Sequence, residues 1–311
     1  MGDIKPTVLC VNHRDKQCGV HQFFKRLTEP LLKSQNFDVY YIDPGDVSEF
    51  DYWLAQINPS IILFNYYTGA TMPWLTPQKV SALKARAKCL CVFHEVNIDH
   101  MGFDLIFHQD PTNTDERFVN LARPIPTFKS FYDDNDTPMI GSFGFGLGGK
   151  GFTRLTALVS QQFERAHIRI NIPFAKFGDE NGQGARDWAK SARDCLTNEN
   201  VTLEVTHDFM DEPQLLDWLA HNDINCFLYD ENYGRGISGT LDYALAVRRP
   251  IAITKSWQFK HIWHYDDSFL VENHQIPHIL DRGVSHLEKF HHIWGDTAVR
   301  ESFEKGFNRF V

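Results

Sequence analysis

The sequence predicts an α/β protein made of two halves, each with a mainly parallel sheet covered by helices. Short apolar runs alternate with longer amphipathic segments along all 311 residues. The runs are rich in Val, Ile, Phe and Tyr and are nearly continuous, which is typical of strands buried on both faces. Hydrophobic residues make up 42% of the chain, which is enough for a core in each half.

The first half opens with an apolar run that leads through a glycine-bearing loop into an amphipathic segment. Repeated alternation of strand and helix favours parallel pairing with right-handed crossovers. The expected strands are Thr7–Val11, Asp38–Ile42, Ile61–Phe64, Cys89–Phe93 and Leu105–Phe107, and the expected helices are Val20–Ser34 and Pro77–Ala87.

A polar, turn-forming stretch at Lys129–Pro138 separates the two halves, because Asp, Asn and Pro residues favour a linker and a fresh strand follows at Met139. The prediction is a first domain over residues 1–135 and a second over residues 136–290. The expected strands of the second are Met139–Phe143, Ile168–Ile172, Val201–Val205, Ile224–Tyr229 and Ile251–Ile253, and its expected helices are Phe152–Arg165, Ala185–Leu196, Glu212–His221 and Gly239–Val247.

The composition excludes several classes of protein. A net charge of −9 without a long Lys/Arg run argues against extended nucleic acid as a partner. No apolar stretch approaches the length of a membrane span, and the N-terminus has no signal-peptide segment. Four of the six cysteines, Cys10, Cys89, Cys91 and Cys226, lie in apolar runs, which suits a reducing compartment. We therefore expect a cytoplasmic protein, and the sequence leaves its oligomeric state open.

The strongest local signal is the glycine-rich loop Gly141–Gly151. Six glycines fall within eleven residues, directly after a predicted strand and before a predicted helix. Glycine lets backbone N–H groups approach an anion closely, and the helix N-terminus adds the positive end of its dipole. Lys150 adds a full positive charge. The spacing differs from a Walker A loop and from Gly-x-Gly-x-x-Gly, so the loop is either a phosphate site or a flexible connection.

The second signal is the polar loop that follows Tyr229 and leads to Ser238-Gly239-Thr240. We predict Ser238 as the N-cap of the helix that runs to about Val247. Hydroxyl groups and backbone donors at that helix start would suit a phosphate. Pairing with the Lys150 loop of the same domain favours this interpretation over a simple cap.

These motifs resemble the C-terminal domain of retaining GT-B glycosyltransferases. The likeness is strong over residues 139–155, Ile-Gly-Ser-Phe-Gly-Phe followed by Lys-Gly-Phe, and over residues 236–254, which begin Gly-Ile-Ser-Gly-Thr-Leu-Asp-Tyr. Cys18-Gly-Val-His-Gln-Phe-Phe is similar to the family's first glycine loop and helix, and Val92-Phe-His94 to its strand end near the sugar. The resemblance implies two Rossmann-like domains facing a central cleft, with the first on the acceptor side. It also implies that residues 291–311 form a terminal helix that packs back on the first domain.

The resemblance further implies hexose transfer from a nucleotide-diphosphate sugar to a glycan, lipid or small-molecule acceptor. Lys150 would hold the pyrophosphate and His94 would lie at the donor sugar, and these two are the candidate catalytic residues. Donor groups that stabilise the departing diphosphate would carry the catalysis. The implied donor-binding residues are Gly19, Gly149, Lys150, Gly151, Phe209, Met210, Glu231, Ser238, Gly239 and Thr240.

No metal or other cofactor is expected, because the family commonly dispenses with a metal and no carboxylate cluster demands one. The paired histidines His261/His264 and His291/His292 lack a third ligand at a suitable spacing and are interpreted as surface or core residues.

Two departures from the family pattern keep other functions open, and the first is that Ser or Phe stands near Gly141-Ser142, where many relatives carry an Arg ahead of the lysine. Positions where many relatives carry a Glu-x7-Glu pair hold Arg235 and Tyr243. The first alternative is therefore a nucleotide- or sugar-binding GT-B protein that has lost catalysis. The second is a Rossmann-type NAD-dependent enzyme that uses the Gly141–Gly151 loop, although no acidic ribose partner follows at the usual distance.

Overall fold

The computed structural model describes residues 5–67, 72–94, 101–175, 178–232 and 236–311. The chain forms two compact units. Unit 1 contains residues 1–124, 234–236 and 293–311, and unit 2 contains residues 125–233 and 237–292. The predicted linker Lys129–Pro138 belongs to unit 2, because Arg249 donates hydrogen bonds to the backbone oxygens of Tyr132 and Asp133.

Unit 1 holds a parallel sheet in the order β2-β1-β3-β4-β5-β6. Its strands are β1 (Thr7–Val11), β2 (Asp38–Ile42), β3 (Ile61–Tyr66), β4 (Lys88–Phe93), β5 (Leu105–His108) and β6 (Phe118–Asn120). Its helices are α1 (Gly19–Leu31), α2 (Val47–Ile57), α3 (Pro77–Leu83) and α11 (Asp296–Phe307).

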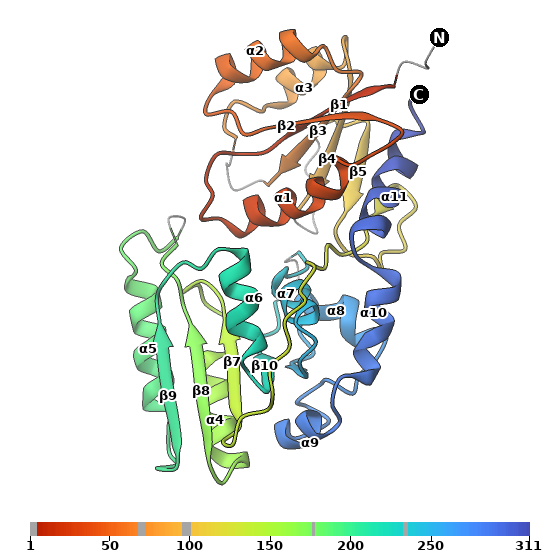
Figure 1. Cartoon of the computed structure of the whole chain (residues 1–311). Helices are drawn as coiled ribbons and strands as arrows, with labels where there is room; N and C mark the ends of the chain where they lie inside the picture. Colours follow the sequence, from red (N-terminus) through yellow and green to blue (C-terminus); the bar gives the residue numbers. More distant parts are fainter. Residues whose placement is uncertain (1–4, 68–71, 95–100, 176–177, 233–235) are drawn as a thin grey trace. The chain divides into compact units, whose positions relative to one another are not determined.

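Helices cover both faces of this sheet, α1 and α11 on one face and α2 and α3 on the other (Figure 1). Successive strand residues point to opposite faces, so Val8 and Cys10 of β1 pack with the helices of the first face. Leu9 and Val11 pack with α2 and α3. Burial on both faces explains the continuous apolar runs of the sequence.

The last helix, α11, belongs to unit 1 although 170 or more residues separate it from the sheet it covers. Phe303 lies 4.8 Å, ring centre to ring centre, from Phe107 of β5. A Cβ atom at Gly306 would come within 2.5 Å of the Phe107 ring, so glycine lets the helix approach the sheet closely. Glu304 accepts a hydrogen bond of 2.6 Å from the Ser34 hydroxyl, just after α1.

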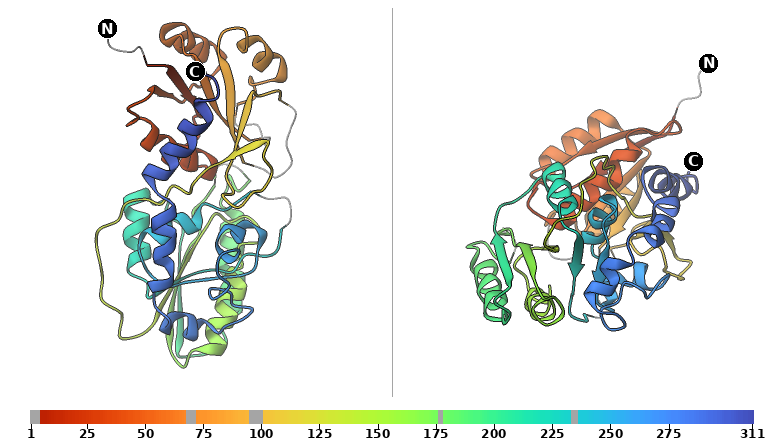
Figure 2. Two further views of the ribbon diagram at one scale, coloured as in Figure 1. Left: turned by 90° about the vertical axis from the view of Figure 1, so that its right-hand side faces the viewer. Right: turned by 60° about the horizontal axis from the view of Figure 1, so that its bottom comes forward.

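Unit 2 holds a second parallel sheet, in the order β11-β10-β7-β8-β9. Helices α4 and α5 pack side by side on one face, and α6 and α7 lie together on the other (Figures 1 and 2). The strands are β7 (Met139–Phe143), β8 (Ala166–Asn171), β9 (Val201–Thr206), β10 (Ile224–Phe227) and β11 (Ile251–Ile253). The helices are α4 (Phe152–Gln162), α5 (Gln183–Asp194), α6 (Glu212–Ala220), α7 (Thr240–Ala246), α8 (Lys260–Trp263), α9 (Ile276–Asp281) and α10 (Glu288–Ile293), the last of which ends at the border of unit 1.

The structure adds elements that the sequence patterns did not predict, among them α2, β6 and the short helices α8 to α10. In α2 only Phe50 and Leu54 are buried, whereas Tyr52 and Trp53 are exposed. Exposed aromatic residues obscure the helical period on which the prediction depends. The four cysteines of the apolar runs, Cys10, Cys89, Cys91 and Cys226, are buried, and none of the six cysteines forms a disulfide.

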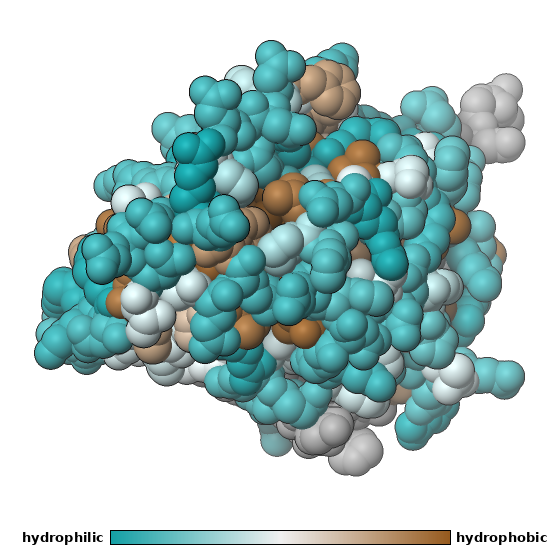
Figure 3. Space-filling view, turned by 90° about the horizontal axis from the view of Figure 1, so that it is seen from below, coloured by the Kyte–Doolittle hydropathy of each residue, from teal (hydrophilic) through white to brown (hydrophobic). Residues whose placement is uncertain are grey.

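Among the described residues, no helix combines the length and apolar character needed to cross a membrane. The face drawn in Figure 3 is mostly hydrophilic, with hydrophobic residues in small separate patches.

Candidate functional site

Each sheet has one place where the strand order changes direction. In unit 1 the chain passes from β1 to β2 and then returns to place β3 on the other side of β1. In unit 2 it runs from β7 to β8 and β9 and then places β10 beside β7. Loops diverge at such a point, and α/β proteins bind ligands there, beyond the carboxyl ends of the strands. We call these places switch point 1, between β1 and β3, and switch point 2, between β7 and β10.

Switch point 2 is built from the glycine-rich loop after β7 and the residues after β10. Gly151 is the N-cap of α4 and has φ 70°. A Cβ atom there would lie 1.8 Å from the carbonyl oxygen of Leu228, so only glycine fits. Gly149 has φ 80°, and its carbonyl oxygen accepts a hydrogen bond of 2.9 Å from the amide of Asp230. The loop is therefore held against the end of β10 by backbone contacts.

Lys150 lies between these two glycines. Its Nζ atom is 4.1 Å from the centre of the Tyr229 ring, a cation–π contact. Tyr229 is 1% exposed, and its hydroxyl group is buried without a hydrogen-bond partner among the described residues. Arg154, in the first turn of α4, forms an ion pair of 2.7 Å with Asp230. Two cations and the N-terminus of an eleven-residue helix thus gather around one loop.

The second predicted loop lies on the β10 side of switch point 2. The prediction that Ser238 is the N-cap of α7 was wrong, because the helix begins at Thr240 and Gly239 takes the cap position. The Ser238 hydroxyl lies 3.0 Å from the Thr240 hydroxyl, and the Ser238 amide donates to the backbone oxygen of Gln258. Glu231 is exposed and accepts a hydrogen bond of 3.2 Å from the amide of Trp257.

Phe209 and Met210 follow β9, two strands away from β7 in the sheet. They precede Asp211, which caps α6 in a capping box with Gln214. Phe209 is 38% exposed, so its ring presents an apolar surface at the carboxyl edge of the sheet. Phe209 and Met210 therefore lie at the carboxyl edge of the second sheet, as Lys150 does, but at the end of that edge formed by β9.

Switch point 1 contains the two predicted residues of unit 1. Gly19 is the first residue of α1, and a Cβ atom there would meet no described atom within 4 Å. His94 directly follows β4, and its Nε2 atom lies 2.5 Å from the Oδ1 atom of Asn65. The pKa of His94 is lowered to about 3, mainly by burial and to a smaller degree by the nearby His13 and Arg123. The ring is therefore neutral at physiological pH.

Sequence reasoning missed the side chains that hold His94. Asn12 and His13 follow β1, Asn65 lies near the end of β3, and all three are buried. The sequence did contain a signal for Asn65, since it is a polar residue within the apolar run Ile-Ile-Leu-Phe-Asn-Tyr. A buried side-chain amide needs hydrogen-bond partners, which marks the position as part of a polar network. Tyr229 was also missed, since it was counted only as the last residue of a strand.

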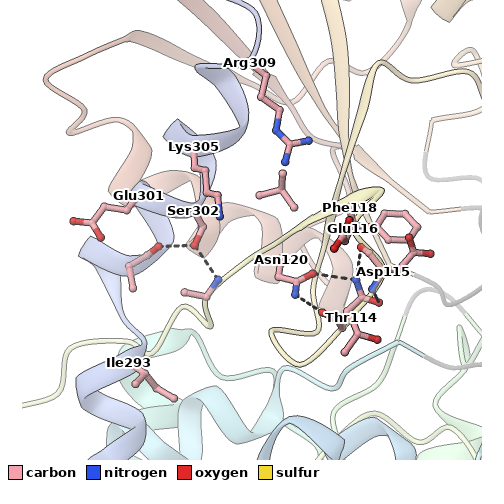
Figure 4. Close-up of a pocket in the computed structure, with 14 residues that line it drawn as sticks. Thr114, Asp115, Glu116, Phe118, Asn120, Ile293, Glu301, Ser302, Lys305 and Arg309 are labelled. Carbon is pink, nitrogen blue, oxygen red and sulfur yellow. Dashed lines mark hydrogen bonds between the residues drawn. The ribbon is translucent and has the colours of Figure 1, made fainter.

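Unit 1 has a further cavity of about 500 Å³ between α11 and the segment around β6. Figure 4 shows Lys305 of α11 and Arg309, which follows the helix, on the side of the cavity opposite Asp115 and Glu116. None of the predicted site residues lines this cavity. Within the described residues, no group of three or more His, Cys, Asp or Glu residues could hold a metal ion.

No protein-family model matches the chain, and no curated protein sequence is similar to it. Solved structures do match, and they define a class of fold. The two parallel sheets and their helices form the two Rossmann-like domains of the GT-B fold, so this prediction from the sequence is confirmed.

Three solved structures illustrate the likeness. A glycosyltransferase from Rickettsia africae ESF-5 matches with a TM-score of 0.65 and 11% identity over 98% of both chains. Trehalose-6-phosphate synthase OtsA matches with a TM-score of 0.66 and 9% identity over 98% of both chains. Anabaena Alr3699/HepE, solved in complex with UDP and glucose, has a TM-score of 0.60 and 11% identity, covering 98% of this chain and 100% of its own.

Proposed function

We propose that this protein is a glycosyltransferase that moves a hexose from a nucleotide-diphosphate sugar to an acceptor without a metal ion. The observation that carries the proposal is the position of Lys150. It lies on a glycine-rich loop at the switch point of the second sheet, where an α/β fold binds ligands. The GT-B fold, shared with glycosyltransferases, supports the same reaction class.

The chemistry follows from charge. A departing nucleoside diphosphate gains negative charge as the glycosidic bond to the sugar breaks, so fixed donors near it lower the barrier. In the proposal, Lys150 and the first amides of α4 meet the diphosphate, and Ser238, Gly239 and Thr240 add donors from the other loop. Phe209 and Met210 would contact the base, Glu231 would face the sugar, and His94 and Gly19 would contribute from unit 1.

The proposal is tested by measuring thermal stabilisation of the purified chain by UDP, GDP, ADP, CMP and NAD, with and without EDTA. A ligand that binds the native state raises the melting temperature by mass action. We expect a shift with one nucleoside diphosphate that EDTA does not remove. A shift with NAD alone would instead support the redox alternative, and a shift that EDTA abolishes would contradict metal independence.

The variant Lys150→Ala is expected to bind the nucleoside diphosphate about 10- to 100-fold more weakly, because a hydrogen bond to a charged group contributes about 1.5–3 kcal/mol. Isothermal titration calorimetry measures this loss. The matched control is Lys190→Ala, since Lys190 is an exposed lysine on α5 of the same unit and lies outside the site. Equal affinity in the two variants would refute the site.

A second candidate function is nucleotide-sugar binding without turnover. The observation that favours it is Tyr243, which stands where many relatives carry Glu and packs against Phe143 with ring centres 6.0 Å apart. A radiolabelled donor sugar that binds but is neither hydrolysed nor transferred would decide for this alternative.

A further inference from the structure

A chain of buried side-chain amides leads from the backbone of α1 to His94 at switch point 1. Asn12 is its first member and is completely buried. Its Oδ1 atom accepts a hydrogen bond of 2.9 Å from the amide of His13, and its Nδ2 atom donates to the carbonyl oxygen of His21 at 3.1 Å. A backbone N–H can only donate and a carbonyl can only accept, so these two contacts fix which end of the Asn12 amide is oxygen.

Asn65 is the second member, and its orientation follows from the first. Its Nδ2 atom lies 2.6 Å from the Oδ1 atom of Asn12 and 3.2 Å from the carbonyl oxygen of Val20. Both neighbours are acceptors, so this end of Asn65 must be the NH2 group. The opposite end, which faces the Nε2 atom of His94 at 2.5 Å, must then be the carbonyl oxygen.

An amide oxygen accepts hydrogen bonds and cannot donate one. We therefore propose that Asn65 is a positioning residue that holds His94 in the tautomer protonated at Nε2, leaving Nδ1 as the unprotonated ring nitrogen. A neutral imidazole in this state receives a hydrogen bond at Nδ1 and gives none there. Any ligand group that meets Nδ1 must be a donor, and a sugar hydroxyl is of this class.

The identity of the ligand rests on the proposed function, whereas the tautomer does not. The network around His94 supports a rigid ring. Phe23 of α1 meets the imidazole edge to face with ring centres 5.7 Å apart. The Tyr41 hydroxyl oxygen accepts the second hydrogen bond of the Asn12 Nδ2 group at 2.8 Å. The low pKa that burial gives His94 excludes the doubly protonated ring, so the tautomer that Asn65 selects persists through the physiological range.

The decisive experiment is a two-dimensional NMR spectrum of the intact chain labelled with 15N in histidine, recorded without ligand. The variant His94→Gln identifies the His94 signals by their disappearance. We expect the wild-type protein to show a protonated nitrogen at Nε2 and an unprotonated nitrogen at Nδ1. A proton on Nδ1 in the wild-type protein would overturn the inference, and this result needs no other variant to fold.

Two substitutions then test Asn65 itself. Asn65→Leu keeps the volume but removes the acceptor, and we expect the two His94 nitrogens to give averaged signals of a tautomer mixture. Asn65→Asp keeps an oxygen towards Nε2 but adds a negative charge beside the ring and turns its second oxygen to the acceptor oxygens of Asn12 and Val20. We therefore expect the proton on Nε2 to be retained and the pKa of His94 to rise relative to the wild-type protein. An unchanged Nε2–H pattern in Asn65→Leu would overturn the role of Asn65. If the protein shows the expected NMR pattern of His94 but binds no nucleoside diphosphate, the proposed tautomer is supported and the proposed function is contradicted.

Discussion

The two switch points occupy corresponding places in the two sheets and are built in opposite ways. Switch point 1 is filled by polar side chains, in which Asn65 is hydrogen-bonded to Asn12 on one side and to His94 on the other. Switch point 2 is built from backbone, with glycines at positive φ, and carries the cations Lys150 and Arg154. The first arrangement fixes the orientation of one polar ring, and the second gathers backbone amides and positive charge where the proposed function places a diphosphate. One fold therefore carries two different constructions at corresponding places, and the sequence of the loop after the first strand decides which.

The largest expected effect tests the claim that switch point 2 depends on backbone approach. Gly151→Ala adds a Cβ atom 1.8 Å from the Leu228 carbonyl oxygen in a left-handed conformation, so we expect a loss of about 3 kcal/mol or more of stability. Urea unfolding measures it. Gly19→Ala is the matched control in unit 1, where the same atom meets nothing within 4 Å, and its stability is expected to change by less than about 0.5 kcal/mol. Equal effects of the two changes would remove the contrast.

A medium effect concerns the buried imidazoles of switch point 1. Burial lowers the pKa of His13 to about 4, whereas its value in the unfolded chain is near the ordinary 6.5. As the pH falls through 6.5 the unfolded state binds the proton first, so stability is lost between about pH 6.5 and 4 and is unaffected above that range. We expect His13 to account for about 3 kcal/mol of this loss.

Urea unfolding at pH 7.5 and pH 4.5 measures this dependence in His13→Gln, which should lose less stability on acidification than the wild-type protein. His264→Gln, at an exposed histidine of unit 2, serves as the control and should keep the wild-type difference. An unaltered pH dependence in His13→Gln would show that the imidazole is not held neutral by burial.

The smallest expected effect is that of Arg154→Ala, which tests how much a side-chain charge contributes to switch point 2 beside the backbone. The ion pair between Arg154 and Asp230 is about half exposed, so Arg154→Ala should cost only about 0.5 kcal/mol of stability. Because Arg154 lies in the first turn of α4, its loss should still weaken nucleoside diphosphate binding, by less than the loss of Lys150 does. Calorimetry at two salt concentrations measures the loss of affinity in both variants. A larger loss in Arg154→Ala than in Lys150→Ala would indicate that the diphosphate binds closer to Arg154 than proposed.

The sequence by itself determined the two parallel sheets, because strands buried on both faces must be continuously apolar and helices between them must be amphipathic. It also located the Gly141–Gly151 loop, since so many glycines beside a lysine between strand and helix have few structural uses. It gave no clear period for α2, whose exposed Tyr52 and Trp53 obscure the pattern, and it placed the start of α7 one residue early.

Only the tertiary structure decided which residues meet. Asn12, Asn65 and His94 are separated by 53 and 29 residues, and they come together because parallel strands β1, β3 and β4 end at the same edge of the sheet. In the same way, Tyr229 comes under Lys150 because β10 returns to lie beside β7. Local sequence encodes local conformation and burial, whereas the order of the strands is set by the packing of the whole unit. The two switch points exist only because that order brings the ends of distant strands together.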